Sequence, residues 1–324
     1  MLSNNSIFSI KSEAEFNKKA LELFEFQSKE CEVYKEFLSY LKFNKPKSYK
    51  EIPCLPISFF KSHKVISGSS DYSLLFKSSG TSKQTRSKHY IKDTQLYKSS
   101  FLNSYKQFIG NPENQIIMAL LPNYLEQGHS SLIYMVKELI DKTKHKSSGF
   151  ILDNKKCILD VYSKLKKEQK LVLIGVSYAL LDLAKEKANL ENATIIETGG
   201  MKGKRKEISK EILHEELCCG LNQKVIFSEY GMTELLSQAY SIGNQIFNSP
   251  NWMKITIRDI NDPFKLKKNG RIGGINIIDL ANHHSCAFIA TDDLGRILKN
   301  GFQVSGRIEK SEQRGCNLLL QENL

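Results

Sequence analysis

The chain has 324 residues, of which 40% are hydrophobic and 25% are charged. This composition can fill the core of one large domain or two ordinary ones, which excludes a wholly disordered chain and a small disulfide-held scaffold. Lys and Arg number 47 against 35 Asp and Glu, a formal net charge of +12. Such a charge suits nucleic acid, acidic lipid, nucleotides or acidic proteins. The basic residues are mostly scattered lysines without an arginine-rich arm, which favours a lysine-rich surface over a nucleic-acid interface.

The seven cysteines are odd in number and form no C-x-x-C pair, so they indicate neither a disulfide framework nor a zinc site. Reduced thiols in the cytosol fit better. The N-terminus lacks the apolar core of a signal peptide, and no stretch approaches the roughly 20 apolar residues of a membrane helix. We therefore expect a cytoplasmic protein with no membrane span.

The first 45 residues are predicted to be helical. Ser12 and Glu15 have the spacing of a capping box, and apolar residues recur on one helical face after them. Three prolines between residues 46 and 56 then end the pattern. We expect residues 1–70 to form a helical segment packed on the core.

Residues 71–250 alternate between short apolar runs and amphipathic stretches. The apolar runs, interpreted as strands, are 116–121, 171–176, 193–197 and 224–227. The amphipathic stretches, interpreted as helices, are 130–141, 178–187 and 206–217. This alternation predicts an α/β core of parallel sheets covered by helices. The helical pattern fades after about residue 250, so we expect a β-rich subdomain over 251–306 and a hinge-like tail over 307–324.

A hydroxyl-rich turn with one glycine lies within residues 77–89. Its members are Ser78, Ser79, Gly80, Thr81 and Ser82. Hydroxyls and backbone N–H groups can bind phosphate oxygens, and the basic residues that follow can neutralise them. The G-x-x-x-x-G-K-[ST] loop is absent. Taken alone, a turn of this composition is most often an ordinary solvated loop.

A second candidate follows the strand at 193–197, where Gly199 and Gly200 end the apolar run. Ligands of α/β sheets bind beyond the carboxyl ends of strands, and glycines there let a flat ring approach the backbone. An ordinary strand-to-helix turn is the alternative.

A third candidate is the Y-G-M-T-E segment in 225–240, interpreted as a strand that runs into a turn and then a helix. The Tyr230 ring could stack on a base, the Thr233 hydroxyl could hold a phosphate, and the Glu234 carboxylate could hold Mg²⁺. A capped helix start at Thr233 or Glu234 is the structural alternative.

A fourth candidate is the T-D-D segment that ends the apolar run near residue 290. Asp292 and Asp293 are interpreted as leaving a strand, where a carboxylate could accept both hydroxyls of a ribose. A simple β-turn is the alternative, because D-D-L-G is good turn chemistry.

The motifs S-S-G-T-S, Y-G-M-T-E, T-D-D and G-R occur in this order over about 240 residues. In this order and rough spacing they resemble the adenylate-forming superfamily of acyl-CoA synthetases, peptide-synthetase adenylation domains and luciferases. Within it, the segment 120–136, the E-T-G-G-M-K-G motif and the terminal R-G-C-N-L-L-L resemble LuxE-type acyl-protein synthetases. The resemblance runs from about residue 50 to the C-terminus. It implies the large N-terminal domain of that fold, with the mobile C-terminal domain absent or vestigial, since 15 residues follow Glu309.

The resemblance also implies an ATP and Mg²⁺ site. The hydroxyl-rich turn would wrap the phosphates, and Gly199 and Gly200 would lie against adenine. The remaining implied roles are stacking on adenine for Tyr230, phosphate contact for Thr233, Mg²⁺ binding for Glu234, ribose binding for Asp293 and a hinge contact to the nucleotide for Arg307. The segment 77–89 departs from the family pattern at Lys83 and Thr85. The hinge-like tail lacks the lysine that is usual in the family.

The function implied is activation of a carboxylic acid, expected to be a fatty acid, as an acyl-adenylate, followed by transfer to a protein cysteine thiol. Cys316 matches the acceptor thiol, and His129 is a candidate base or substrate-positioning group whose alternative is a polar residue at a helix N-terminus. An acyl-CoA or aldehyde reductase, or an acyl transferase, would be the protein partner. No nucleic-acid partner is expected.

Two other functions stay open at this point. An adenylating ligase of the phenylacetate-CoA ligase type would load CoA or a carrier protein, and would need the missing C-terminal domain from another chain. A basic nucleotide- or nucleic-acid-binding protein without catalytic activity would use the positive charge, but it predicts clustered arginines beside exposed aromatics, which the sequence does not show clearly.

Overall fold

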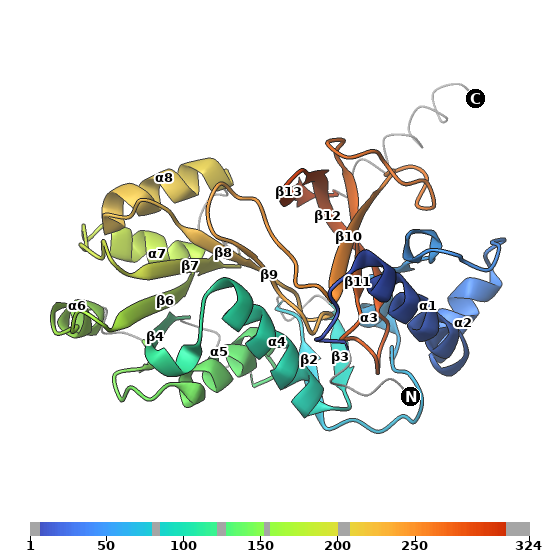
Figure 1. The fold of residues 1–324 in the computed structure, drawn as a ribbon, viewed down its shortest axis with the longest axis horizontal. Helices are drawn as coiled ribbons and strands as arrows, with labels where there is room; N and C mark the ends of the chain where they lie inside the picture. The colour runs from blue at the N-terminus through green and yellow to red at the C-terminus, as the bar shows by residue number, and fades with distance from the viewer. Residues whose placement is uncertain (1–6, 80–84, 122–127, 152–155, 200–207, 309–324) are drawn as a thin grey trace.

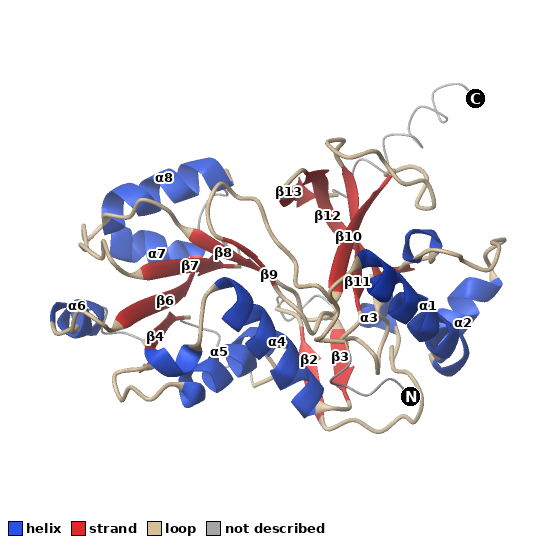
Figure 2. Cartoon of the chain, viewed as in Figure 1, coloured by secondary structure: helices blue, strands red, loops and turns tan. Residues whose placement is uncertain are grey.

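The computed structural model describes residues 7–79, 85–121, 128–151, 156–199 and 208–308. Two sheets dominate the fold, and a small hairpin lies between them (Figure 1). Helices flank the first sheet, while the second lies beside the N-terminal helices (Figure 2). The N-terminal and C-terminal parts of the chain therefore meet on one side of the molecule.

The first sheet has six strands in the order β5-β4-β6-β7-β8-β9, parallel except for β9. The strands are β4 Gln115–Leu120, β5 Gly149–Phe150, β6 Lys170–Val176, β7 Thr194–Thr198, β8 Phe227–Tyr230 and β9 Ala239–Ser241. β4 is buried along its whole length and β6 from its second residue onward, as expected for a sheet covered on both faces. The structure thus confirms the expected α/β class.

Helices cover both faces of this sheet, with α4 and α5 on one side and α7 and α8 on the other (Figure 1). They are α4 Thr94–Phe108, α5 Ser131–Lys142, α6 Lys156–Ser163, α7 Ser177–Ala184 and α8 Lys210–Leu221. Asp93, Ser130 and Ser209 cap α4, α5 and α8 by accepting backbone N–H bonds. Among the described residues, no helix is both long and apolar enough to cross a membrane.

The second sheet has five strands, in the order β1-β12-β11-β10, with β13 also paired to β12. They are β1 Leu55–Pro56, β10 Met253–Arg258, β11 Gly273–Asp279, β12 Phe288–Leu298 and β13 Gly301–Arg307. β1 is parallel to β12, and the other pairs are antiparallel. The hairpin between the sheets consists of β2 Leu74–Lys77 and β3 Lys88–Ile91.

The N-terminal helices are α1 Glu13–Glu30, α2 Glu32–Ser39 and the short α3 Phe59–Ser62, with 3₁₀ turns at Tyr49–Glu51 and Pro112–Asn114. Ser12 caps α1, as its spacing to Glu15 predicts. Phe24 and Tyr34 pack on Phe288 of β12, with ring centroids 6.2 and 5.9 Å apart. The N-terminal helices therefore pack against the second sheet rather than against the parallel one.

The helix expected after Y-G-M-T-E does not form. The segment from Gly231 to Gln238 is an irregular loop that joins β8 to β9 of the first sheet, with a turn at Thr233 and Glu234. The backbone N–H groups of Leu236 and Ser237 donate to Oδ2 of Asp279, at 3.1 and 2.9 Å. Because a carboxylate from the second sheet satisfies these donors, the segment does not need helical hydrogen bonds.

The turn considered at Asp292 and Asp293 is also absent. Both residues lie inside β12, which continues to Leu298. Asp293 pairs in register with Arg307 of β13. The partner strand supplies the ladder hydrogen bonds that local turn chemistry would otherwise satisfy.

Candidate active site

Three predicted site residues meet at the junction of the two sheets. The Tyr230 hydroxyl at the end of β8 donates to Oδ2 of Asp293 at 2.7 Å. Nε of Arg307 donates to Oδ1 of the same carboxylate at 3.2 Å. The Asp293 side chain is 11% exposed and that of Arg307 is 82% exposed. The nearly buried carboxylate therefore lies beside a cation that is accessible to solvent.

Two aromatic rings hold the Tyr230 ring in place. Its centroid lies 5.7 Å from that of Phe247 and 5.6 Å from that of Phe302. Burial, together with the Asp293 carboxylate, raises the pKa of the Tyr230 phenol well above its ordinary value. The hydroxyl thus remains a hydrogen-bond donor at any physiological pH.

Gly199 follows β7 in a left-handed conformation, with φ of 73°. The Ser177 hydroxyl contacts both the Gly199 carbonyl, at 3.1 Å, and Oε1 of Glu197, at 2.6 Å. Nζ of Lys210 lies 2.6 Å from each oxygen of the Glu197 carboxylate. A half-buried ion pair, joined to the Gly199 carbonyl through the Ser177 hydroxyl, thus anchors the backbone at the glycine. Gly200 lies outside the described residues.

A second carboxyl group occupies the neighbouring strand. The Thr198 hydroxyl donates to Oε2 of Glu229 at 2.5 Å. Burial raises the pKa of Glu229 to about 7, assisted by the charge of Glu197 and opposed by Lys210. A side chain at Gly231 would require the Glu229 carboxyl group to move.

Thr198 and Glu229 border a small, mostly apolar cavity between the parallel sheet and the helices α4 and α5. Its apolar lining includes Leu132, Met135 and Leu139 of α5. The cavity measures about 10 Å³, about enough for one water molecule. A larger ligand would enter only if the surrounding side chains moved.

The β2–β3 hairpin carries the predicted phosphate turn. Ser78 bonds to Ser87 across the hairpin, through its backbone N–H at 3.0 Å and through its hydroxyl, which accepts the Ser87 N–H at 2.9 Å. Ser79 is exposed. Gly80, Thr81 and Ser82 lie outside the described residues, so the structure gives the base of this turn and not its tip.

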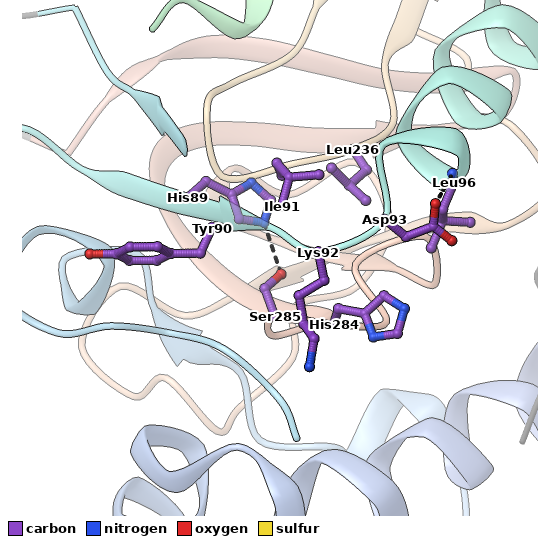
Figure 3. A pocket seen from close by; sticks show the side chains of 9 residues that line it. All are labelled: His89, Tyr90, Ile91, Lys92, Asp93, Leu96, Leu236, His284 and Ser285. Atoms are coloured by element: carbon purple, nitrogen blue, oxygen red, sulfur yellow. Dashed lines mark hydrogen bonds between the residues drawn. The ribbon is translucent and has the colours of Figure 1, made fainter. Parts of the chain in front are cut away.

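The base of the hairpin packs on the Thr233–Glu234 segment. Nδ1 of His89 lies 2.8 Å from the Thr233 carbonyl, and Nε2 lies 2.9 Å from the Ser285 hydroxyl (Figure 3). Since a carbonyl can only accept, the Nδ1 atom carries the proton and Ser285 donates. Burial lowers the pKa of His89 to about 4, so the ring stays neutral.

Glu234 is the next residue in this segment. Its side chain is buried, and burial raises its pKa, while a hydrogen bond from Ser87 and the charges of Lys61 and Arg307 lower it. The described residues contain no group of three or more His, Cys, Asp or Glu side chains that could hold a metal ion. A cation at Glu234 would therefore need ligands from the substrate or from water.

His129 lies just before α5, next to the hairpin. Its Nδ1 is 3.1 Å from the Leu75 carbonyl, and its own carbonyl accepts the Lys77 N–H at 2.9 Å. Ser130, and not His129, caps the helix. The ring is exposed beside β2, and Cys316 lies outside the described residues.

The sequence motifs did not single out His89, Ser177, Lys210 or Glu229. One available signal was Glu197, an acidic residue at the end of an apolar strand, which demands a partner when buried. The partner, Lys210, is 13 residues later in the sequence, and its identity depends on how α8 packs on the sheet.

A family model described as "Acyl-protein synthetase, LuxE" matches residues 7–324. A search of curated proteins finds no match. Among solved structures, an open conformation of 2-hydroxyisobutyryl-CoA ligase in complex with 2-HIB-AMP and CoA superposes with a TM-score of 0.67 at 11% identity, covering 92% of this chain and 70% of that one.

ATP-bound MatB from Rhodopseudomonas palustris superposes with a TM-score of 0.53 at 15% identity, covering 72% of this chain. An ATP-bound RpMatB-BxBclM chimera gives 0.54 at 16% identity, with the same coverage. This chain spans about half the length of these structures, covering 47% of each. The likeness establishes the fold as that of the adenylate-forming ligases.

Proposed function

The chain belongs to the LuxE acyl-protein synthetase family, and from this membership we propose that it activates a carboxylic acid with ATP and transfers the acyl group to a protein cysteine thiol. The observation that carries the proposal is the contact of Tyr230 and Arg307 with one carboxylate, Asp293. It unites three separate sequence motifs at the carboxyl end of a parallel strand, where α/β folds bind nucleotides.

Several described residues have the chemistry that an ATP site requires. The Asp293 carboxylate has acceptor capacity left for ribose hydroxyls, because two oxygens can accept about four hydrogen bonds. The Tyr230 ring, held by its aromatic neighbours, and the left-handed Gly199 would accommodate the adenine. The turn that begins at Ser78 would bind the phosphates, with Thr233 beside them.

We assign Mg²⁺ binding to Glu234. Mg²⁺ is usually held by one or two carboxylates together with substrate phosphates and water, which agrees with a lone buried carboxylate at this place. Bound there, the ion would offset the repulsion between the two anionic reactants. Arg307 would supply further positive charge from the exposed side.

The first half-reaction joins acid and nucleotide. An oxygen of the acid's carboxylate attacks the α-phosphorus of ATP, and the bond to pyrophosphate breaks as pyrophosphate leaves. We propose that the acyl group extends toward the apolar cavity beside Leu132 and Met135, whose lining suits an alkyl chain such as that of a fatty acid. His129 is our candidate for positioning the acid.

The second half-reaction transfers the acyl group to sulfur. A thiolate attacks the acyl carbon, a C–S bond forms, and the C–O bond to AMP breaks as AMP leaves. We propose Cys316 as this thiol, with Arg314 two residues away to favour the thiolate. A reductase or acyl transferase would then receive the acyl group, and a reducing cytoplasm would keep the thiol available.

ATP–pyrophosphate exchange, screened across straight-chain and aromatic acids, tests the first half-reaction. Incubation with ATP, Mg²⁺ and labelled acid tests the second. Cys316→Ser should retain exchange but lose a hydroxylamine-labile label, whereas Cys219→Ser, which changes an exposed cysteine, should keep both. A label that persists without Cys316 would contradict the assigned acceptor, and thioester formation only with added CoA would favour a CoA ligase.

A further inference from the structure

The loop that joins β10 to β11, residues 259–272, has a defined internal structure. The Asp259 N–H bonds to the Lys265 carbonyl at 2.8 Å, and the Lys267 N–H bonds to the Ile257 carbonyl at 2.8 Å. The Gly270 N–H bonds to the Ile297 carbonyl at 2.8 Å, which fastens the loop to β12. The side chains at its surface are therefore presented on a fixed frame.

This loop exposes large apolar side chains. Ile260, Phe264 and Ile272 are 38%, 57% and 48% exposed, and they are three of the nine exposed large hydrophobic residues in the described chain. Ile260 and Ile272 each lie two residues beyond Arg258 and Gly274, the last pair of the β10–β11 ladder. Scattered exposed apolar residues are ordinary, but a cluster on one loop indicates an interaction site.

The same loop also carries exposed cations. Lys265, Lys268 and Arg271 are exposed in the same loop. Of the two acidic residues of the loop, one has a salt bridge and the other keeps an exposed charge. Asp259 pairs with Lys267 at 3.4 Å, and the Asp262 carboxylate accepts the Phe264 N–H at 3.1 Å. The loop therefore combines three exposed apolar side chains with a net charge of +2, from three lysines and one arginine against two aspartates.

A further exposed cation, Lys299, belongs to the turn between β12 and β13. The hydrogen bond from Gly270 to Ile297 fastens the loop beside this turn. Lys299 thus adds to the positive charge on the same end of the sheet.

We infer that the 259–272 loop docks the protein on an anionic lipid bilayer, with Phe264, Ile260 and Ile272 entering the interfacial region and the cations facing headgroup phosphates. Apolar side chains flanked by Lys and Arg are what interfacial anchoring requires. A protein partner fits less well, because three side chains of one loop offer far less than the roughly 800 Å² that each partner buries in a standard interface. The inference is independent of the proposed catalysis.

Co-sedimentation of the full chain with sucrose-loaded vesicles tests the inference. The protein should bind vesicles of phosphatidylcholine mixed with phosphatidylglycerol, bind much less to phosphatidylcholine alone, and dissociate as salt is raised. Ile260→Ser/Phe264→Ser/Ile272→Ser should lower the partition coefficient by about tenfold or more. Phe264→Trp should show a blue-shifted emission on the anionic vesicles, distinguishable because the native Trp252 is buried.

Matched variants separate the local cluster from the overall charge. Lys265→Ser/Lys268→Ser/Arg271→Ser should lower partitioning by about a hundredfold, at about fivefold per cation. Lys164→Ser/Lys166→Ser/Lys167→Ser, which removes three exposed cations elsewhere, should leave most of the binding intact.

The apolar control is Tyr40→Ser/Ile212→Ser/Ile242→Ser, which removes exposed side chains outside the loop and should have little effect. Equal losses of vesicle binding in the two triple-cation variants would show that only the overall charge matters, and would overturn the inference. Absence of binding to anionic vesicles, or binding that survives loss of the three apolar side chains, would overturn it as well and would leave the loop to a protein partner.

Discussion

Nζ of Lys210, the first residue of α8, lies 2.6 Å from both carboxylate oxygens of Glu197, the penultimate residue of β7. The Glu197 side chain is fully buried, whereas that of Lys210 is 43% exposed. Ser177 links the same carboxylate to the carbonyl of Gly199. The pair thus couples the start of a helix to the glycine proposed to face the adenine.

Lys210→Met should destabilise the protein by about 2 kcal/mol, because it leaves a buried carboxylate without its cation. The loss is smaller than for a completely buried pair, since water reaches the lysine side. ATP should also bind more weakly through displacement of Gly199. Urea unfolding and calorimetric titration with ATP measure the two effects.

Two variants serve as controls for this pair. Lys210→Arg should retain most of the wild-type stability, because it keeps the cation. Glu197→Gln/Lys210→Met should be more stable than Lys210→Met alone, because no buried charge remains. A double variant as unstable as Lys210→Met would show that the lysine acts by packing and not by charge.

Glu229→Gln should stabilise the protein increasingly as pH rises. The native pKa is raised from 4.5 to about 7, so the folded state holds a proton that the unfolded state releases between these values. The wild type therefore loses stability as pH rises through this interval, by on the order of 2 to 3 kcal/mol, and glutamine avoids that loss.

Urea unfolding from about pH 5 to about pH 8 measures this difference. Glu216→Gln, which changes an exposed carboxylate on α8, is the matched control and should show no comparable trend. A Glu229→Gln advantage that is constant with pH would contradict the assignment of the titrating group.

Tyr230→Phe should weaken ATP binding about fivefold, the equivalent of one hydrogen bond of about 1 kcal/mol, because it keeps the ring but frees Asp293. Asp293→Asn should weaken binding further by removing the charge that holds Arg307. Calorimetry with ATP reports both. Tyr162→Phe, which removes a hydroxyl bonded to Asn192, is the control and should bind ATP normally.

Glu234→Gln should abolish most Mg²⁺-dependent pyrophosphate exchange while leaving the fold intact, since the amide retains the shape but not the charge of the carboxylate. Exchange rates measured against Mg²⁺ concentration, alongside thermal melting, separate loss of the metal from loss of the fold. Near-normal exchange in a folded variant would disprove the metal assignment.

The sequence by itself determined the local elements and the fold class. Burial of the strand at 171–176 on both faces requires the continuous apolar run that these residues show. Ser12 caps α1 because its hydroxyl needs only the N–H three residues on. The family resemblance likewise rested on short contiguous motifs. These features depend on interactions within a few residues, which a linear pattern contains.

Tertiary structure decided where distant groups satisfy one another. No helix follows Glu234 because Asp279, more than forty residues later, takes the backbone N–H bonds of Leu236 and Ser237. Asp293 stays within a strand because β13 pairs with it, and Lys210 meets Glu197 only because α8 packs back on the sheet. A buried polar group must find a partner, but its sequence position does not say which one, so only the folded chain selects it.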